Sequence, residues 1–355
     1  IASHWVDDPE RHRRLFPMDI RPQSHEIIRT WAFYTIVKAY LHEREIPWKH
    51  VVISGWILDP DRKKMSKSQG NVITPEPLID QYGADSVRYW AARARLGVDT
   101  AYDEQVFKIG KKLCTKIFNA SRFALRRFEQ VDRQLLTPDR IITETDRAVI
   151  GQLRPVIQQA TAAFEQFDYA QALSVIEDFF WRDFCDNYLE LAKGRTYEET
   201  LTPERISACA TLRLVHRAVI RLFAPFVPFL ADAVWSWAYA EDADMHLSVH
   251  RSPWPSIAEF REIPEPVGEK VWDATLAVLD AIRRVKADAN KSMAAPLDSA
   301  VITAPEPILR AVASTMNDIQ AMLKIHSVKT AAAAADADAV TVDAVFAPET
   351  QPGGE

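Results

Sequence analysis

A long run of helical periodicity is the feature that most constrains how this chain can fold. From Glu104 onward, apolar residues recur at the spacing of one helix face, and lysines and arginines occupy the remaining positions. Further helices, separated by prolines, glycine or polar residues, are predicted at about 144–166, 170–193, 204–223 and 226–240. Because amphipathic helices bury their apolar stripes against one another, this region is predicted to be an α-helical bundle.

The residues before the bundle combine helix and strand patterns. A helix is predicted from about Ser24, its N-cap, to Leu41, and apolar residues cover most of its circumference. We therefore expect this helix to be buried on nearly all sides. A β-rich run at 51–58 ends at the turn signal Asp59-Pro60-Asp61. A lysine-rich loop follows, and two short helices are predicted after it, one starting at Pro75 and one over 85–95.

Beyond the bundle, helix and strand patterns alternate in a way that predicts a small α+β unit. Helices are predicted at Val271–Asn290 and near Pro307–Leu323, and β-like runs at Ser299–Thr303, Lys324–Val328 and Val340–Phe346. The alanine tract 331–335 is predicted to be a loop, and residues 349–355 a flexible tail.

Charge is distributed unevenly along the chain. The formal net charge is −6, which by itself argues against a polyanionic ligand. However, residues 1–130 contain 22 Lys and Arg against 16 Asp and Glu, whereas residues 131–355 contain 21 against 33. A ligand that carries phosphates is therefore expected in the first third of the chain.

Cysteine content and hydropathy exclude several classes of protein. The three cysteines are too few and too far apart for a disulfide framework or a thiolate metal site, which indicates a reducing compartment and predicts no protein-bound metal. No uncharged apolar stretch approaches the length of a membrane-spanning helix, so no membrane contact is predicted. The chain begins at Ile1 without methionine or a leader pattern, and we therefore expect a segment of a longer protein.

The most informative stretch is the loop KKMSKSQGN at residues 63–71. It places three lysines and two serine hydroxyls between a β-run and a helix, where Gly70 lets the backbone bend and Asn71 can hydrogen-bond its own main chain. Lysine is a compact charge on a flexible stem, and the hydroxyls and main-chain N–H groups add hydrogen bonds. Composition alone fits a solvated surface or a targeting patch better. The order of the residues favours a mobile clamp for a polyphosphate.

That order carries a family resemblance. The string KMSKS closely resembles the second ATP-binding signature of class I aminoacyl-tRNA synthetases. Its surroundings, SGWILDPDRKKMSKSQGNVITPEPLIDQYGADSVRYWAARA, are similar to the valyl, isoleucyl and leucyl group, and MDIRPQSHEIIRTWAFYT is most similar to the valyl members. The resemblance implies the C-terminal half of a Rossmann-type catalytic domain at 1–100, an anticodon-binding helical bundle at 101–262 and a small α+β unit at 263–348.

The resemblance also implies a set of site residues. ATP would be bound by the loop residues Lys64, Met65, Ser66, Lys67 and Ser68. Of these, Lys64 and Lys67 would be catalytic, because the family's matching lysines stabilise the departing pyrophosphate. The amino-acid pocket would involve His25, Glu26, Ile27 and Trp31, although helical periodicity alone favours a core position for Ile27 and Trp31. Cations on the first bundle helix would contact tRNA phosphates, unless they form only a solvated face: Lys108, Lys111, Lys112, Lys116, Arg122 and Arg126.

The chain departs from the family pattern at several points. The family usually has glycine at the position of Ser24, often aspartate at Glu26 and commonly lysine at Gln69. No histidine-x-glycine-histidine string, the first ATP motif of the family, occurs in the sequence. We therefore expect the N-terminal catalytic half to be missing, an uncovered apolar face around Trp31 and Trp56, and no catalysis by the isolated segment.

The implied activity is ligation of valine to tRNA(Val) in the cytoplasm. Valine would be activated with ATP and Mg²⁺ to valyl-adenylate, and the acyl group would then be transferred to a terminal ribose hydroxyl of the tRNA. The partners would be tRNA(Val), ATP, valine and the missing N-terminal catalytic half. Two alternatives stay open: an isoleucyl or leucyl member of the same group, and a tRNA-binding module that activates no amino acid.

Overall fold

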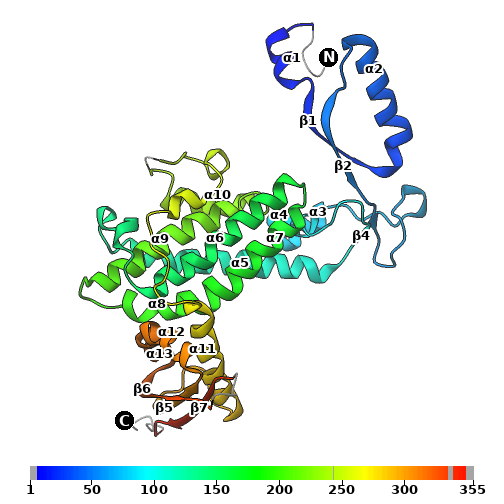
Figure 1. Cartoon of the computed structure of the whole chain (residues 1–355). Coiled ribbons are helices and arrows are strands. Elements are labelled where there is room, and N and C mark those ends of the chain that lie inside the picture. Colours follow the sequence, from blue (N-terminus) through cyan, green and yellow to red (C-terminus); the bar gives the residue numbers. More distant parts are fainter. Residues whose placement is uncertain (1–5, 243, 335–338, 349–355) are drawn as a thin grey trace. The chain divides into compact units, whose positions relative to one another are not determined.

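The computed structural model describes residues 6–242, 244–334 and 339–348. The chain divides into two compact units, residues 1–115 with 161–173, and residues 116–160 with 174–355. We call them unit 1 and unit 2. Three helices continue from one unit into the other: α5 (Glu104–Phe128), α6 (Glu144–Glu165) and α7 (Tyr169–Asp178) (Figure 1). The predicted tail 349–355 lies outside the described residues.

Unit 1 begins with a parallel β–helix–β crossover. Helix α1 (Pro9–Leu15) precedes β1 (Met18–Ser24), which pairs in parallel with β2 (Trp48–Ser54). The connection is helical but not uniformly α: a 3₁₀ turn, a π turn and then α2 cover His25–Ile27, Ile28–Ala32 and Phe33–Glu43. The sequence pattern missed β1, because its polar residues and Pro22 give weak strand propensity and its hydrogen bonds come from distant β2.

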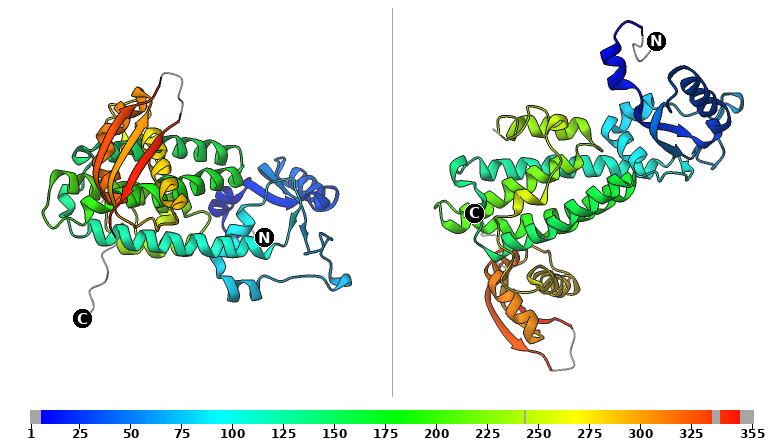
Figure 2. Two further views of the ribbon diagram at one scale, coloured as in Figure 1. Left: turned by 90° about the horizontal axis from the view of Figure 1, so that it is seen from below. Right: turned by 45° about the horizontal axis from the view of Figure 1, so that its top comes forward.

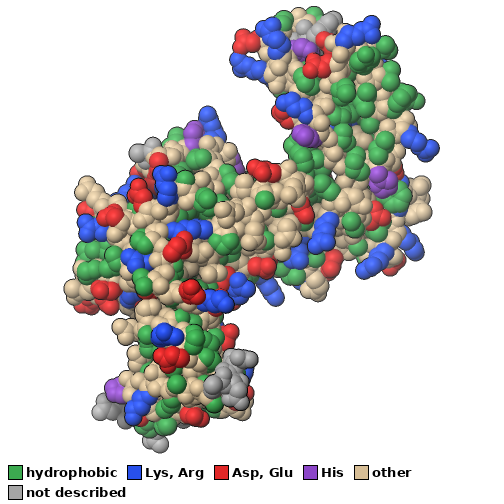
Figure 3. Space-filling view, in the orientation of Figure 1, with side chains coloured by type: hydrophobic (Ala, Val, Ile, Leu, Met, Phe, Trp, Pro, Cys, Tyr) green, Lys and Arg blue, Asp and Glu red, His purple; other side chains and the backbone are tan. Residues whose placement is uncertain are grey.

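The expected burial of the crossover helix is wrong. Its large apolar side chains are exposed, with Trp31 and Tyr34 at 60% and Leu41 at 62%. A two-stranded sheet is too narrow to cover a helix that is apolar on most sides, and hydrophobic side chains gather over α2 in Figure 3. The expected uncovered face around Trp31 is therefore confirmed in the described structure, whereas Trp56 is half-buried.

The rest of unit 1 carries the lysine-rich loop. Strand β3 (Ile57–Leu58) pairs in parallel with β4 (Thr100–Ala101), and the loop, α3 (Glu76–Tyr82) and α4 (Ala84–Ala92) lie between them in sequence. Gly55 precedes β3 at a close backbone approach, since a Cβ there would lie 2.3 Å from the main chain of Val98. The predicted loop and two helices are confirmed in this order, whereas the predicted β-run at 51–58 is divided between the end of β2 and β3.

Unit 2 contains most of the helical bundle. After α7, the chain continues as a π-helix (Phe179–Tyr188) and α8 (Leu189–Thr196), followed by α9 (Pro203–Phe223) and α10 (Pro228–Ala238). Helix α9 is buried along most of its length, and Trp235 of α10 is fully buried. The predicted bundle is confirmed, but the helix predicted at 170–193 contains a π segment, because wide turns leave no distinct mark in apolar periodicity.

The C-terminal part of unit 2 is the predicted α+β unit. Its sheet has the order β6-β5-β7, with β5 parallel to β6 and antiparallel to β7, and its helices gather on one face (Figure 2). The elements are α11 (Val271–Asp288), β5 (Leu297–Ala304), α12 (Glu306–Val312), α13 (Met316–Leu323), β6 (Ile325–Ala332) and β7 (Thr341–Phe346). The loop predicted at the alanine tract is wrong for Ala331 and Ala332, because both extend β6 by pairing with β5. Ala335 lies outside the described residues.

A buried histidine makes the stability of unit 2 depend on pH. His216 lies with Nδ1 2.7 Å from the Tyr239 hydroxyl and Nε2 2.8 Å from the Ser121 hydroxyl, and burial lowers its pKa to about 3. Below pH 6.5 the unfolded chain therefore takes up a proton that the folded chain resists. The resulting stability is complete above about pH 6.5 and falls by up to about 1.4 kcal/mol per pH unit towards pH 3.

We therefore expect His216→Gln to flatten the pH dependence of unfolding. Glutamine can keep one donor and one acceptor in this core but does not titrate, so its own cost is constant with pH. Urea unfolding at pH 7.5 and 5 measures the difference between wild type and variant. Equal losses of stability on acidification in both proteins would contradict the assignment.

Candidate functional site

The lysine-rich loop has a defined backbone despite its exposure. A turn after Asp59 returns the chain so that Lys64 forms an isolated antiparallel bridge with Leu58. Ser66 then caps a 3₁₀ turn at Lys67–Gln69 by accepting a hydrogen bond from the N–H of Gln69, and Gly70 ends that turn with a φ of 68°. The loop therefore forms a hairpin with one helical turn, and its mobility stays a prediction.

The base of the loop is closed by Asp59 and Asn71. Asn71 Nδ2 donates to Asp59 Oδ2 at 2.7 Å and to the main-chain oxygen of Lys64 at 3.2 Å, and Asn71 Oδ1 accepts from the N–H of Ser66 at 2.9 Å. Asp59 Oδ1 accepts from the N–H of Lys63 at 2.8 Å. Asn71 was predicted to bond its own main chain, but its side chain bonds the main chain of Lys64 and Ser66 instead, because the loop folds back onto it. Asp59 was assigned only to a turn, and no local pattern marks its contact with Asn71.

Lys64 meets residues of the crossover helix. Its Nζ lies 2.5 Å from Glu26 Oε2 and 4.4 Å from the centre of the Trp56 ring. The hydrogen bond from Lys64 lowers the pKa of Glu26, which keeps the carboxylate ionised. The ring of His25 lies 4.9 Å from that of Trp56, centre to centre. The structure therefore brings together His25, Glu26 and Lys64, three of the residues predicted for the site, and adds Trp56.

Lys67 and Ser68 present donors to solvent. Lys67 and Ser68 are exposed, and the hydroxyl oxygens of Ser66 and Ser68 lie 3.2 Å apart. The N–H groups of Lys67 and Ser68 open the 3₁₀ turn, where a helix leaves main-chain donors without partners inside the helix. Ammonium groups, hydroxyls and main-chain donors together fit a polyphosphate.

The described residues hold no group of three or more His, Cys, Asp or Glu side chains arranged to bind a metal ion. A magnesium ion that accompanied a polyphosphate would depend on phosphate oxygens and water, which is how proteins commonly bind it.

The predicted pocket residues on the crossover helix are only partly enclosed. Ile27 is half-buried at the end of the 3₁₀ turn, and Trp31 lies in the π turn with the guanidinium of Arg21 5.9 Å from its ring centre. A core position, the alternative for both residues, does not fit Trp31 at 60% exposure. Trp31 is therefore accessible to a ligand or to another segment of protein.

The cations predicted to contact RNA lie on α5, and several already have partners. Lys108 pairs with Glu104 at 3.1 Å, Lys111 donates to the main-chain oxygen of Gln81 at 3.1 Å, and Lys116 pairs with Asp186 at 3.1 Å. Lys112, Arg122 and Arg126, also in the predicted set, are exposed to solvent. These contacts fit a solvated helix face and a phosphate-binding helix face equally well.

Unit 2 contains a hollow that the sequence pattern did not indicate. It has a volume of about 660 Å³ and is lined by cations from three elements, Lys193, Arg283 and Lys324, and by Asp186 and Glu190. Tyr197, 59% exposed, also lines it. These residues come from α8, the π-helix and the α+β unit, so only the fold brings them together. The excess of cations over acids and the exposed aromatic ring are compatible with RNA.

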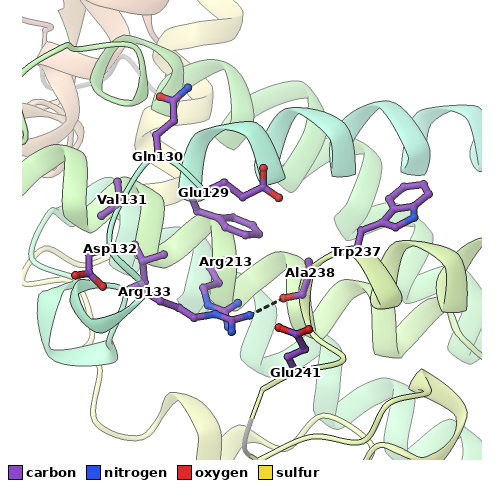
Figure 4. Close-up of a pocket in the computed structure, with 11 residues that line it drawn as sticks. Glu129, Gln130, Val131, Asp132, Arg133, Arg213, Trp237, Ala238 and Glu241 are labelled. Atoms are coloured by element: carbon purple, nitrogen blue, oxygen red, sulfur yellow. Dashed lines mark hydrogen bonds between the residues drawn. The ribbon is translucent and has the colours of Figure 1, made fainter.

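A second hollow of about 490 Å³ lies at the end of α5 (Figure 4). Arg133 and Arg213 are outnumbered there by three acids, Glu129, Asp132 and Glu241. Arg133 already donates to the main-chain oxygen of Ala238 at 3.0 Å. A polyanion does not fit this lining.

Two family models match the chain. Residues 2–103 match tRNA synthetases class I (I, L, M and V), and residues 146–302 match the anticodon-binding domain of tRNA ligase. No helix in the described ranges is both long enough and apolar enough to cross a membrane.

Curated proteins and a solved structure agree with these matches. The valine–tRNA ligase of Thermobifida fusca is 46% identical over 85% of this chain and 33% of its own length, and that of Wolbachia sp. subsp. Brugia malayi is 41% identical over 93% and 38%. The chain thus spans about a third of the length of these relatives. A LeuRS of Agrobacterium radiobacter K84, solved with tRNA and LeuAMS, shares the fold with a TM-score of 0.53 and 21% identity, over 77% of this chain and 35% of its own.

Proposed function

We propose that this chain, which belongs to the class I aminoacyl-tRNA synthetases, is the part of a valine–tRNA ligase that carries the second ATP-binding loop and the tRNA-binding bundle. The complete protein would first join valine to ATP. A carboxylate oxygen of valine attacks the α-phosphorus, the bond from that phosphorus to the bridging oxygen breaks, and pyrophosphate leaves. A ribose hydroxyl of tRNA(Val) then attacks the acyl carbon, and AMP leaves.

The observation that carries the proposal is the loop at Lys64–Ser68. During the first step, negative charge grows on the departing pyrophosphate, and donors already in place stabilise that charge without having to reorganise. Lys67 and Ser68 offer an exposed ammonium, a hydroxyl and the N–H groups of the 3₁₀ turn. Lys64 is assigned to the same phosphates, together with Ser66 and Met65 of the signature. Magnesium would arrive with ATP and be held by its phosphate oxygens.

The crossover helix would form one wall of the amino-acid pocket. Glu26, ionised beside Lys64, and His25 are proposed to face the adenylate, and Ile27 and Trp31 the side chain of valine. The exposed apolar residues of α2 support a further partner, the N-terminal catalytic half of a complete enzyme, because such a surface is rarely left uncovered.

The tRNA is proposed to contact cations on α5 and cations in unit 2. The hollow beside Lys193, Arg283 and Lys324 and the basic face of α5 offer phosphate contacts, and Tyr197 offers a ring on which a base can stack. The α5 residues proposed for these contacts are those predicted from the sequence: Lys108, Lys111, Lys112, Lys116, Arg122 and Arg126. We assign the complete protein to the cytoplasm, where its tRNA and ATP are available.

Amino-acid-dependent ATP–pyrophosphate exchange by the complete protein tests the function. We expect exchange with valine, and a kcat/KM lower by about 10²-fold with isoleucine or leucine, because a pocket distinguishes one methylene by about that factor. The isolated chain is expected to bind tRNA in a salt-dependent way and to catalyse no exchange. Exchange with isoleucine alone or with leucine alone would contradict the proposed specificity for valine. A complete protein that binds tRNA but activates none of the three would be the binding module instead.

A further inference from the structure

Asp59 and Asn71 form a closed pair at the base of the lysine loop, which we call the Asp59–Asn71 clasp. Asp59 is only 6% exposed, and its carboxylate oxygens accept from different partners, the N–H of Lys63 and Nδ2 of Asn71. Nδ2 also donates to Lys64, so both amide hydrogens of Asn71 are used. The remaining Oδ1 accepts from Ser66. The clasp therefore leaves no polar atom of the Asn71 side chain without a partner.

The charge of Asp59 fixes the orientation of the carboxamide. The hydrogen bonds from Asn71 and from the N–H of Lys63 lower the pKa of Asp59, so the side chain is a carboxylate that can only accept. The amide nitrogen of Asn71 must then face Asp59, which leaves the amide oxygen to face the N–H of Ser66. The reversed orientation would set two acceptors against each other and two donors against each other.

The structure assigns Asp59 and Asn71 as positioning residues for the proposed adenylation reaction, because their clasp holds the main chain on both sides of Met65 and so directs Lys64 and Lys67 towards ATP phosphates. The main-chain bonds of Asn71 are to Lys64 and Ser66, the two neighbours of Met65. Ser66 in turn caps the turn that starts at Lys67. This assignment rests on the proposed function.

The loop needs such a restraint because packing supplies little. The side chains from Asp61 to Lys64 and from Lys67 to Gln69 are exposed, and Arg62 and Gly70 have positive φ values. An exposed segment without a buried anchor samples many conformations, and each lysine would then meet a phosphate only part of the time. Asp59 is the buried anchor, and Asn71 connects it to the loop.

Exchange kinetics of the complete protein test the assignment. Asn71→Ala is expected to lower kcat for ATP–pyrophosphate exchange by about 10²-fold, since misplacing a catalytic group by about 1 Å has that effect. The KM for valine should stay within about twofold, because the clasp does not touch the proposed valine pocket. Gln69→Ala is the matched control in the same loop, since the Gln69 side chain is exposed and, among the described residues, forms no hydrogen bond with Asp59 or Asn71. An unchanged kcat for Asn71→Ala would overturn the assignment.

Exchanging the aspartate and the asparagine between positions 59 and 71 distinguishes a positioning role from a general loss of folded structure. Asn71→Asp sets two carboxylates against each other, whereas adding Asp59→Asn restores one donor and one acceptor between the two positions. We expect the double variant to recover kcat by about tenfold over Asn71→Asp alone, as coupled neighbours do. Recovery will be incomplete because the carboxylate at position 71 cannot donate to Lys64. A double variant no faster than Asn71→Asp would contradict the clasp.

Amide hydrogen exchange of the chain itself distinguishes this inference from the proposed function. Asn71→Ala should speed exchange of the Ser66 amide, which loses its acceptor, and leave the amides of β2 unchanged. If the wild-type complete protein activates no amino acid, the proposed function fails, and a faster Ser66 amide then shows that the clasp still orders the loop. If the wild type is active and Asn71→Ala changes neither kcat nor this amide, the inference fails and the function stands.

Discussion

Lys67→Ala in the complete protein is expected to slow adenylate formation by about 10²–10³-fold, the effect of removing one preorganised donor from a developing negative charge. Among the described residues, no hydrogen bond or ion pair holds the Lys67 ammonium, so it can follow the phosphates without first breaking a contact. Lys64 differs, because it must leave Glu26 and Trp56 to do the same. Lys67→Ala should therefore have a larger effect than Lys64→Ala.

Single-turnover formation of the adenylate, measured apart from valine binding, gives the required rate. The valine dissociation constant should change by less than about twofold, since Lys67 is assigned to the phosphates, whose charge grows in the transition state, and not to valine. Lys63→Ala is the matched control: Lys63 is exposed in the same loop, and its ammonium lies 4.0 Å from Asp61. If Lys67→Ala formed the adenylate as fast as Lys63→Ala, Lys67 would have no role in the catalytic step.

The sequence predicted best those elements that are determined by residues close together in the chain. Helices α6 and α9 lie within one or two residues of their predicted limits, because long apolar periodicity records helical structure directly. The loop was identified from the order of five adjacent residues. By contrast, β1 contains polar residues and a proline, and it is a strand only because β2 supplies its hydrogen bonds.

The site contacts were harder to predict because they join residues distant in sequence. Glu26 and Lys64 are 38 positions apart, and Asp59 and Asn71 are 12 apart, without a periodic pattern to pair them. The predicted burial of Trp31 failed for a related reason: an apolar pattern records what a helix can bury but not which segment covers it. The hollow in unit 2 also draws its lining from separate elements, so no single stretch of sequence indicates it.

A buried ionic network in unit 2 is expected to contribute strongly to the stability of the protein. Arg195 of α8 donates to Asp146 of α6 at 2.8 and 2.9 Å and to Asp318 of α13 at 2.9 and 3.1 Å. Asp146 also accepts from the hydroxyls of Ser207, at 2.6 Å, and Tyr188, at 2.8 Å. Arg195 therefore connects the helical bundle to the α+β unit through two carboxylates.

The pKa values of the two carboxylates move in opposite directions. Burial alone would raise the pKa of Asp146, but the charge and hydrogen bonds of Arg195 and the bond from Ser207 hold it below its ordinary value. Burial raises the pKa of Asp318, with Arg195 opposing. The contribution of Asp146 to stability is thus present above its unfolded pKa near 3.8 and is lost as pH falls further. At neutral pH both carboxylates are therefore paired with the same guanidinium.

Arg195→Met is therefore expected to lower the free energy of unfolding by about 3–5 kcal/mol at pH 7, the cost of leaving buried charge uncompensated. Adding Asp146→Asn and Asp318→Asn should recover part of that loss, because both buried charges are then removed. Lys193→Ala on the same helix breaks a partly exposed pair with Glu190 and a contact 5.9 Å from the Phe123 ring centre, and should cost less than about 1 kcal/mol. Urea unfolding followed by tryptophan fluorescence measures all three. An Arg195→Met loss no larger than that of Lys193→Ala would mean that the network adds nothing to stability.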